Sequence, residues 1–306
     1  MGGSSSPLGE FLRARRELLQ PEDVGLPREA SRRVPGLRRE EVAARADISP
    51  EYYLRIEQGR DRRPSEQVVR SLAKALMLDD NGLTYLSRLA RPRPYLRAVR
   101  ASVAVSESVT RLLERWKQTP AYVTDANLDV LASNPMARLI APDILVPGTN
   151  LLEAAYERRT MTTLMRAGDG EPDDEEIIRE YVAALRFNGD PHDARLQDVV
   201  GRLSTRHLSF RRIWAEYDVK PLSAGVTETL IEPFGTVSLN WQTLGIPRSP
   251  GQFLTTYMAE PGSTAAAALR ALSSGASSGD EVPMRRLEPP LVLGGSDREA
   301  RDERAS

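Results

Sequence analysis

The sequence predicts a mainly α-helical protein of two domains, an all-α domain of five helices followed by an α+β domain. Three observations predict this class. Residues 37–59 have the pattern of two short helices joined by a tight turn. Helical spacing of apolar residues recurs on both sides of that stretch. From residue 121 the order is two strand patterns, a block of helices and three further strand patterns.

The N-terminal domain is predicted over residues 8–90, after a flexible polar tail at 1–7. Three helices besides those of residues 37–59 are marked by apolar side chains at helical spacing. Their marking residues are Leu8, Phe11, Leu12, Leu18 and Leu19, then Val68, Leu72, Ala75 and Leu76, then Leu83, Leu86 and Leu89. Together these patterns predict a small bundle of five helices.

Residues 37–59 are the most informative stretch of the domain. Ala43 and Ala46 are small enough to let two helices cross closely, and the chain is predicted to turn at Asp47. Ser49 is a typical N-cap, and Pro50 follows it at the first helical position. A capped helix after such a turn presents its first two turns to the DNA major groove. The pattern therefore predicts a DNA-binding helix-turn-helix.

The outer face of the second helix supplies the candidates for contacts with bases, which are Pro50, Glu51, Tyr52 and Arg55. Arg55 can form a two-pronged contact with guanine, and Glu51 can accept a hydrogen bond from cytosine. Glu51 has an equally good alternative role, because a carboxylate complements the positive end of a helix dipole. The candidates for contacts with DNA phosphates are Arg38, Arg39, Ser49, Arg60, Arg62 and Arg63.

Charge is distributed unevenly along the chain. Residues 1–100 hold 20 Lys and Arg against 14 Asp and Glu, a balance of +6, whereas residues 101–306 hold 22 against 29, a balance of −7. Phosphate binding requires positive charge on the helix-turn-helix domain, and an acidic remainder limits unspecific attraction to DNA. The alternative is that Arg-rich loops only reflect the codon usage of a GC-rich genome.

The composition argues against several functional classes. The chain contains no Cys, which excludes disulfides, thiolate nucleophiles and thiol-based redox sensing. It has no apolar run of 18 residues and no signal-peptide pattern, so a cytoplasmic protein without membrane contact is expected. His192 and His207 are the only histidines, and neither a nucleophile elbow nor metal-ligand spacing is present. We therefore expect no catalytic residues, metal or cofactor.

Residues 91–120 are predicted to link the two domains. The alternating prolines of residues 91–94 cannot continue a helix and indicate a short, stiff hinge. A helix with one apolar stripe follows, formed by Val105, Val109, Leu112, Leu113 and Trp116 and ended by Pro120. Core packing is the favoured role of this stripe, and a connector that transmits strain or a dimerising helix are the alternatives.

The second domain is predicted over residues 121–273 as one five-stranded antiparallel sheet with helices on one face. The strand patterns are residues 121–124, 128–132, 226–231, 236–244 and 253–258. A pocket between sheet and helices would be lined by Arg211, Trp214, Asn240, Trp241, Phe253 and Tyr257. Such a pocket suits an amphipathic ligand, whose carboxylate Arg211 could bind, although plain core packing and a surface ion pair are alternatives. Residues 274–306 lack periodicity and are predicted to be disordered.

Residues 8–90 resemble the DNA-binding domain of XRE (Cro/repressor-like) regulators, in their MmyB-like branch. The resemblance rests on LGEFLRARRELL at 8–19, PGLRREEVA at 35–43, ISPEYYLRIEQGRDRRPS at 48–65 and LAKALMLDD at 72–80. It implies that Glu57 has a structural role. Asp47 departs from the family, whose turn usually has Gly, but Asp tolerates the left-handed conformation better than most residues.

Residues 105–273 are similar to the PAS-like ligand-binding domain of MmyB-like regulators. The similarity rests on VTDANLDVLASNPMARLI at 123–140, NLLEAAYE at 150–157, FRRIWAEYDV at 210–219, GTVSLNWQTL at 235–244 and AEPGSTAAAALRAL at 259–272. It implies a ligand-responsive protein that holds a fatty-acid-like or other apolar molecule between sheet and helices.

These observations predict a sequence-specific transcription regulator with a small apolar ligand. A single helix-turn-helix domain contacts one half-site, so we expect a homodimer on a double-stranded DNA operator, with half-sites about 34 Å apart. Two other classes stay open. One is a protein-interaction module, such as an antitoxin-like or sporulation partner, whose basic face is incidental. The other is an enzyme that acts on the bound molecule.

Overall fold

The computed structural model describes residues 6–28, 32, 34–61, 63–91, 104–157, 174–278 and 291–293. The chain divides into two compact units, one formed by residues 1–97 and 191–221 and the other by residues 98–190 and 222–306. Within the described ranges, no helix combines the length and the apolar character needed to cross a membrane. The prolines of the predicted hinge, Pro92 and Pro94, lie outside the described residues.

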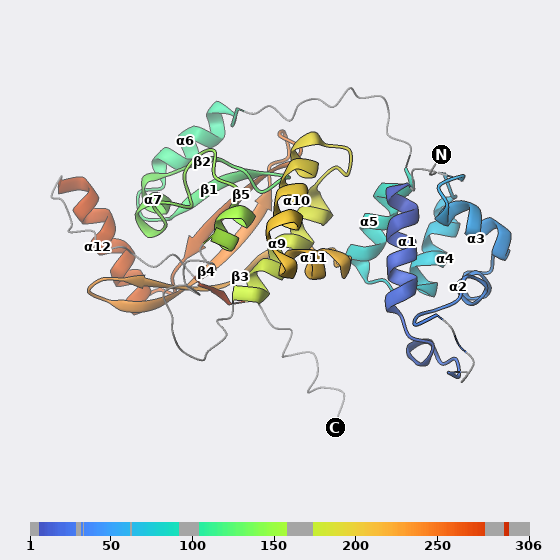
Figure 1. The fold of residues 1–306 in the computed structure, drawn as a ribbon. Coiled ribbons are helices and arrows are strands. Elements are labelled where there is room, and N and C mark those ends of the chain that lie inside the picture. The colour runs from blue at the N-terminus through green and yellow to red at the C-terminus, as the bar shows by residue number, and fades with distance from the viewer. Residues whose placement is uncertain are drawn as a thin grey trace. The chain divides into compact units, whose positions relative to one another are not determined.

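The five predicted helices of the first unit are confirmed, and Figure 1 shows them as one bundle in blue to cyan. They are α1 (Pro7–Leu18), α2 (Arg39–Arg45), α3 (Pro50–Glu57), α4 (Glu66–Ala75) and α5 (Asp80–Ala90), with a short 3-10 helix, η1 (Glu22–Val24), after α1. Leu12, Val42, Tyr53, Ile56, Leu72 and Leu86 are completely buried between them. The ring of Phe11 on α1 meets Tyr85 on α5 edge to face, with 5.0 Å between centroids.

The turn between α2 and α3 has the predicted geometry. Asp47 adopts a left-handed conformation with φ 54°. The Ser49 side chain accepts a hydrogen bond from the Tyr52 backbone N–H at 3.1 Å, which caps α3, and Pro50 is the first residue of the helix. Because the first N–H groups of a helix have no partner within it, this cap fixes where α3 begins.

Two helices within the residue range predicted for the second domain lie in the first compact unit. They are α10 (Ala194–Arg206) and α11 (Leu208–Ala215). Just after α11, the Tyr217 ring lies 6.5 Å from that of Phe11, and the Asp218 carboxylate is 3.4 Å from the Arg15 guanidinium on α1. Apolar periodicity correctly predicted that these helices bury one face, but it does not tell which element covers that face.

The second unit contains all five predicted strands. They are β1 (Ala121–Asp125), β2 (Val130–Ser133), β3 (Ala224–Ile231), β4 (Gly235–Gly245) and β5 (Gln252–Met258), which lie side by side in Figure 1. A sixth strand, β6 (Leu291–Leu293), pairs with β3, and the antiparallel order is β2-β1-β5-β4-β3-β6. The helix α12 (Thr264–Ser278) also extends past residue 273. Within the segment predicted to be disordered, the structure thus describes residues 274–278 as helix and residues 291–293 as strand.

Helices cover both faces of this sheet, and not one face as predicted. Besides α12, the described helical segments of this unit are α6 (Glu107–Arg115), α7 (Pro135–Ile140), residues 151–157 and α9 (Asp174–Asn188). Leu113 of α6 packs with Ala121, Val123 and Leu254, whereas Tyr181 of α9 lies with Tyr122. Neighbouring residues of a strand point to opposite faces, so α6 and α9 lie on opposite sides. The predicted stripe of α6 therefore packs into the core through Leu113, with Val105, Val109 and Trp116 partly buried beside it, whereas Leu112 is exposed.

Candidate DNA-binding surface and ligand recess

The outer face of α3 carries the four side chains predicted to contact bases. Pro50, Glu51 and Arg55 are exposed, and Tyr52 is half-buried. The Arg55 guanidinium lies over the Tyr52 ring, 5.4 Å from its centroid. Such a cation–π contact restricts the long Arg side chain before any partner binds. The arrangement presents a positioned guanidinium in the second turn of α3.

The inner face of α3 ends at Glu57, which is completely buried. Its carboxylate accepts hydrogen bonds from Arg16 of α1, at 3.2 and 3.3 Å, and from Arg39 of α2, at 2.9 and 3.1 Å. Arg13 is 3.6 Å away. The third guanidinium nitrogen of Arg16, Nη1, donates to the Leu37 carbonyl at 2.9 Å. Glu57 therefore holds α3 against α1 and α2, in line with the structural role implied by the resemblance.

Burial by itself raises the pKa of Glu57, but hydrogen bonds from Arg39 and Arg16, with the charges of both, lower that pKa below its ordinary value of 4.5. The pKa of Tyr53 beside this cluster is raised, mainly by burial and also by the negative charge of Glu57. At neutral pH the cluster therefore holds a carboxylate and guanidinium groups next to an uncharged phenol.

Helix α1 approaches α3 closely at a glycine. A Cβ atom at Gly9 would lie 2.1 Å from the Glu57 carbonyl oxygen, which is far inside van der Waals contact. Gly36 is similarly placed, because its Cβ would lie 2.4 Å from the carbonyl oxygens of Arg16 and Glu17. Neither position has space for a Cβ atom, so the two glycines allow the close backbone approach that brings Arg16 to Glu57.

The predicted phosphate contacts have different environments. Arg60 and Arg63 are exposed in the segment between α3 and α4, and Arg62 lies outside the described residues. Ser49 is exposed, and its oxygen caps α3. Arg39 is 46% exposed, although it is held by Glu57. To contact a phosphate, the Arg39 guanidinium would either keep the ion pair with Glu57 or exchange Glu57 for the phosphate.

The backbone of Arg38 takes part in the start of α2. Its N–H donates to the Glu41 carboxylate at 2.6 Å, and Glu41 is also ion-paired with Arg32. Burial raises the pKa of Glu41, whereas hydrogen bonds from Arg32 and from the backbone of Arg38 lower it. The lowering is the larger effect, so the pKa of Glu41 lies below its ordinary value. The Arg38 side chain is half-buried at the start of α2. This is where a phosphate-binding residue of a helix-turn-helix is expected to lie.

The second unit contains a small recess between α9 and the sheet. It is lined by Tyr122, Glu180, Tyr181, Leu222, Trp241, Thr243 and Tyr257. The recess measures about 10 Å³, enough for about one water molecule and far below the 300–1,000 Å³ of typical ligand pockets. Burial raises the pKa of Tyr122 and of Tyr257, so both phenols are uncharged at neutral pH.

The six predicted pocket residues divide between the two units. Trp241 and Tyr257 line the recess, while Phe253 lies on the same face of β5 but outside it. Asn240 is on the opposite face and donates a hydrogen bond to Glu260 at 3.4 Å. Arg211 and Trp214 are on α11 in the other unit, where Trp214 stacks on Phe210. Asn240 therefore faces away from the recess, and the described residues that line the recess all belong to the second unit.

Comparison with known families gives two matches. Residues 105–272, more than half of the chain, match the MmyB-like transcription regulator ligand binding domain, and residues 7–86 match a helix-turn-helix domain. No match was found among curated proteins. The two matched segments correspond to the helical bundle with the capped α3 and to the sheet with its helices.

Proposed function

We propose that this chain, which belongs to the MmyB-like transcription regulators, binds a double-stranded DNA operator as a homodimer. We also propose that an apolar ligand in its PAS-like domain changes the affinity for the operator. It is a DNA-binding regulator with a ligand-binding domain, and both matched domains are of regulatory type. The operator contacts, the dimer and the kind of ligand are the proposed parts.

One observation carries the DNA-binding part. The exposed residue Ser49 caps the start of α3, and Arg55 lies over Tyr52 on the outer face of the helix. On the inner face, Glu57 forms ion pairs with three arginines. A recognition helix requires these two properties together, a polar face that can enter the major groove and a fixed orientation. We assign base contacts to Pro50, Glu51, Tyr52 and Arg55, and phosphate contacts to Arg38, Arg39, Ser49, Arg60, Arg62 and Arg63.

We propose a homodimer because of the small DNA-contacting surface of a single α3 helix. One α3 helix covers one half-site, and two copies are needed to span half-sites about 34 Å apart. A dimer also doubles the basic surface, which strengthens the salt-dependent attraction to DNA phosphates.

A route from ligand to DNA is supported by the contacts of α1. The family match at 105–272 includes α10 and α11, and the residues after α11 touch α1 through Tyr217 and Asp218. Helix α1 in turn holds Glu57 through Arg16. A ligand changes operator affinity only if it binds the DNA-competent and DNA-incompetent states differently. Displacing the Tyr217 segment from α1 would create two such states.

The ligand part is assigned to the recess beside Trp241 and Tyr257. Its lining is mainly aromatic, and the Trp241 indole N–H has no hydrogen-bond partner among the described residues. A buried donor of this kind favours a ligand with one polar acceptor on an apolar body. At about 10 Å³ the recess has to widen, so α9 is expected to move away from the sheet when a fatty-acid-like molecule enters.

Mass spectrometry of the purified chain tests the ligand part. We expect native spectra to carry an added mass that denaturation releases as a small apolar compound. When this compound is titrated into an operator-binding assay, the dissociation constant should change by about 5- to 150-fold. Thr243→Leu narrows the recess and should abolish that response, whereas Gln242→Leu, on the opposite face of the same strand, should retain it. An equal response in both variants would contradict this site.

A further inference from the structure

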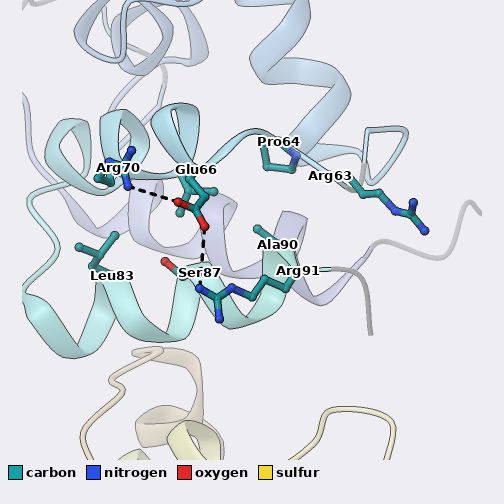
Figure 2. Close-up of a pocket in the computed structure, with 9 residues that line it drawn as sticks. Arg63, Pro64, Glu66, Arg70, Leu83, Ser87, Ala90 and Arg91 are labelled. Atoms are coloured by element: carbon teal, nitrogen blue, oxygen red, sulfur yellow. Dashed lines mark ion pairs between the residues drawn. The ribbon is translucent and has the colours of Figure 1, made fainter. Parts of the chain in front are cut away.

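A cavity of the first unit lies in the DNA-binding domain itself, between the start of α4 and the end of α5. Its volume is about 410 Å³, within the range of small-molecule sites. The cavity is lined by Arg63, Pro64, Glu66, Val69, Arg70, Leu83, Ser87, Ala90 and Arg91, most of which Figure 2 labels. Neither the helix-turn-helix contacts nor the recess in the sheet domain uses this cavity.

The floor and the rim of the cavity differ in chemistry. Pro64, Val69 and Ala90 are buried and give the floor an apolar surface. Three arginines and one glutamate stand on the rim, a net charge of +2. A cavity with an apolar floor and a cationic rim matches a molecule that joins an apolar body to an anionic group.

The rim arginines are weakly engaged. Glu66 lies between Arg70 and Arg91, as Figure 2 shows, at 3.6 and 4.0 Å from their nitrogens. These are long ion pairs, and both arginines and Glu66 are more than 60% exposed. Arg63 extends away from Glu66 in Figure 2, and among the described residues no carboxylate lies within ion-pair distance of its guanidinium. Exposed pairs of this kind stabilise a fold little, so an incoming anion can replace Glu66 at low cost.

From this geometry we propose that the α4–α5 cavity binds a compact apolar molecule that carries one carboxylate. The carboxylate bridges Arg70 and Arg91, since a guanidinium offers paired N–H donors that match two carboxylate oxygens. The apolar body lies on Pro64, Val69 and Leu83. A flat ring suits this position, because it can stack on a guanidinium plane while it covers the apolar floor.

Occupation of the cavity should also oppose operator binding, and this consequence depends on the proposed DNA-binding function. Arg63 and Pro64 belong to the segment between α3 and α4, which carries proposed phosphate contacts. An anion at this position lowers the positive potential of that segment and competes with DNA phosphates. Binding to the cavity can be measured without DNA, so the two ideas fail separately.

The test titrates 2-naphthoate into the 15N-labelled full chain and follows amide chemical shifts without DNA. We expect saturable shifts at Val69, Leu83 and Ser87. The double variant Arg70→Gln/Arg91→Gln should raise the dissociation constant at least about tenfold, because two charge-assisted hydrogen bonds are lost. Arg88→Gln is the matched control, since Arg88 lies on α5 over the Tyr85 ring and does not line the cavity. Its dissociation constant should equal that of the unmodified chain.

Further arms separate the possible causes. The uncharged 2-naphthamide should bind the unmodified chain about tenfold more weakly, and both compounds should lose binding in Ser87→Phe, which fills the cavity without changing its charge. Shifts elsewhere, or a dissociation constant that the double variant leaves unchanged, would overturn the proposal. Binding of an acidic peptide in the cavity without binding of 2-naphthoate would also overturn it, because the carboxylate would then belong to a protein partner.

Discussion

Glu57→Ala is expected to lower the free energy of unfolding of the N-terminal unit by about 3–5 kcal/mol, because it removes the buried anionic partner of Arg16 and leaves that buried guanidinium only the half-exposed Glu17. The loss corresponds to a fall in melting temperature of at least about 10 °C for a domain of this size. It should appear in thermal and urea unfolding followed by circular dichroism. Glu51→Ala, an exposed change on the same helix, is the matched control and should cost less than about 1 kcal/mol.

The same carboxylate predicts how stability depends on pH. The pKa of Glu57 in the folded state lies below 4.5, its ordinary value in the unfolded chain. The stabilisation is therefore fully present above pH 4.5 and is lost as the pH falls through the folded-state pKa. Glu57→Gln removes this ionisation, so its stability deficit should be constant near neutral pH and should shrink in acid. A deficit that grows in acid would contradict an ionised Glu57 in the cluster.

Arg55→Ala is expected to weaken operator binding by about 5- to 150-fold, the range given by about 1–3 kcal/mol for a two-pronged base contact. The variant should also lose preference at one base pair of the operator, while its binding to unrelated DNA changes little. Fluorescence anisotropy with the operator and with single-base variants of it measures both effects. The helix itself should stay intact, since Arg55 is exposed and outside the core.

Arg60→Ala separates base recognition from charge. This exposed side chain is assigned to phosphate, so its loss should weaken binding to all sequences equally and reduce the slope of affinity against salt by about 1. If Arg55→Ala behaved in the same way as Arg60→Ala, Arg55 would be a phosphate contact and the assignment of base recognition to α3 would fail at this residue. Unchanged affinity and preference in Arg55→Ala would favour the protein-interaction module.

Local rules predicted the helix-turn-helix well. The Ser-Pro pair has a strong preference for helix starts, and Asp tolerates the left-handed turn, so both features were visible without tertiary information. Turn residues and alternation likewise located the five strands within two residues of their observed ends. In each case the signal lies within a few neighbouring residues.

The charged cluster behind α3 also has a signal in the sequence. Arg16 follows Leu8 and Leu12 at steps of four residues, and Glu57 follows Tyr53 at the same step, so both lie on the inner faces of their helices. Charged residues at such positions are stable only when they are paired. Two inward charges of opposite sign therefore indicated a buried ion pair.

The pocket prediction failed where long-range geometry decides. The alternation that located β4 also places Asn240 and Trp241 on opposite faces, so Asn240 could have been excluded. No local pattern indicates that α10 and α11 belong to the first unit, or that residues 291–293 pair with β3. Such pairings depend on the free energy of the whole fold, which neighbouring residues do not report.

Selection of binding sites from random double-stranded DNA by the purified full chain tests the central claim most directly. The account predicts enrichment of one motif with two inverted half-sites, their centres one helical turn, or about 34 Å, apart. It also predicts that Arg55→Ala selects a motif relaxed at the same position in each half. Recovery of no enriched sequence would contradict a DNA-reading role for α3.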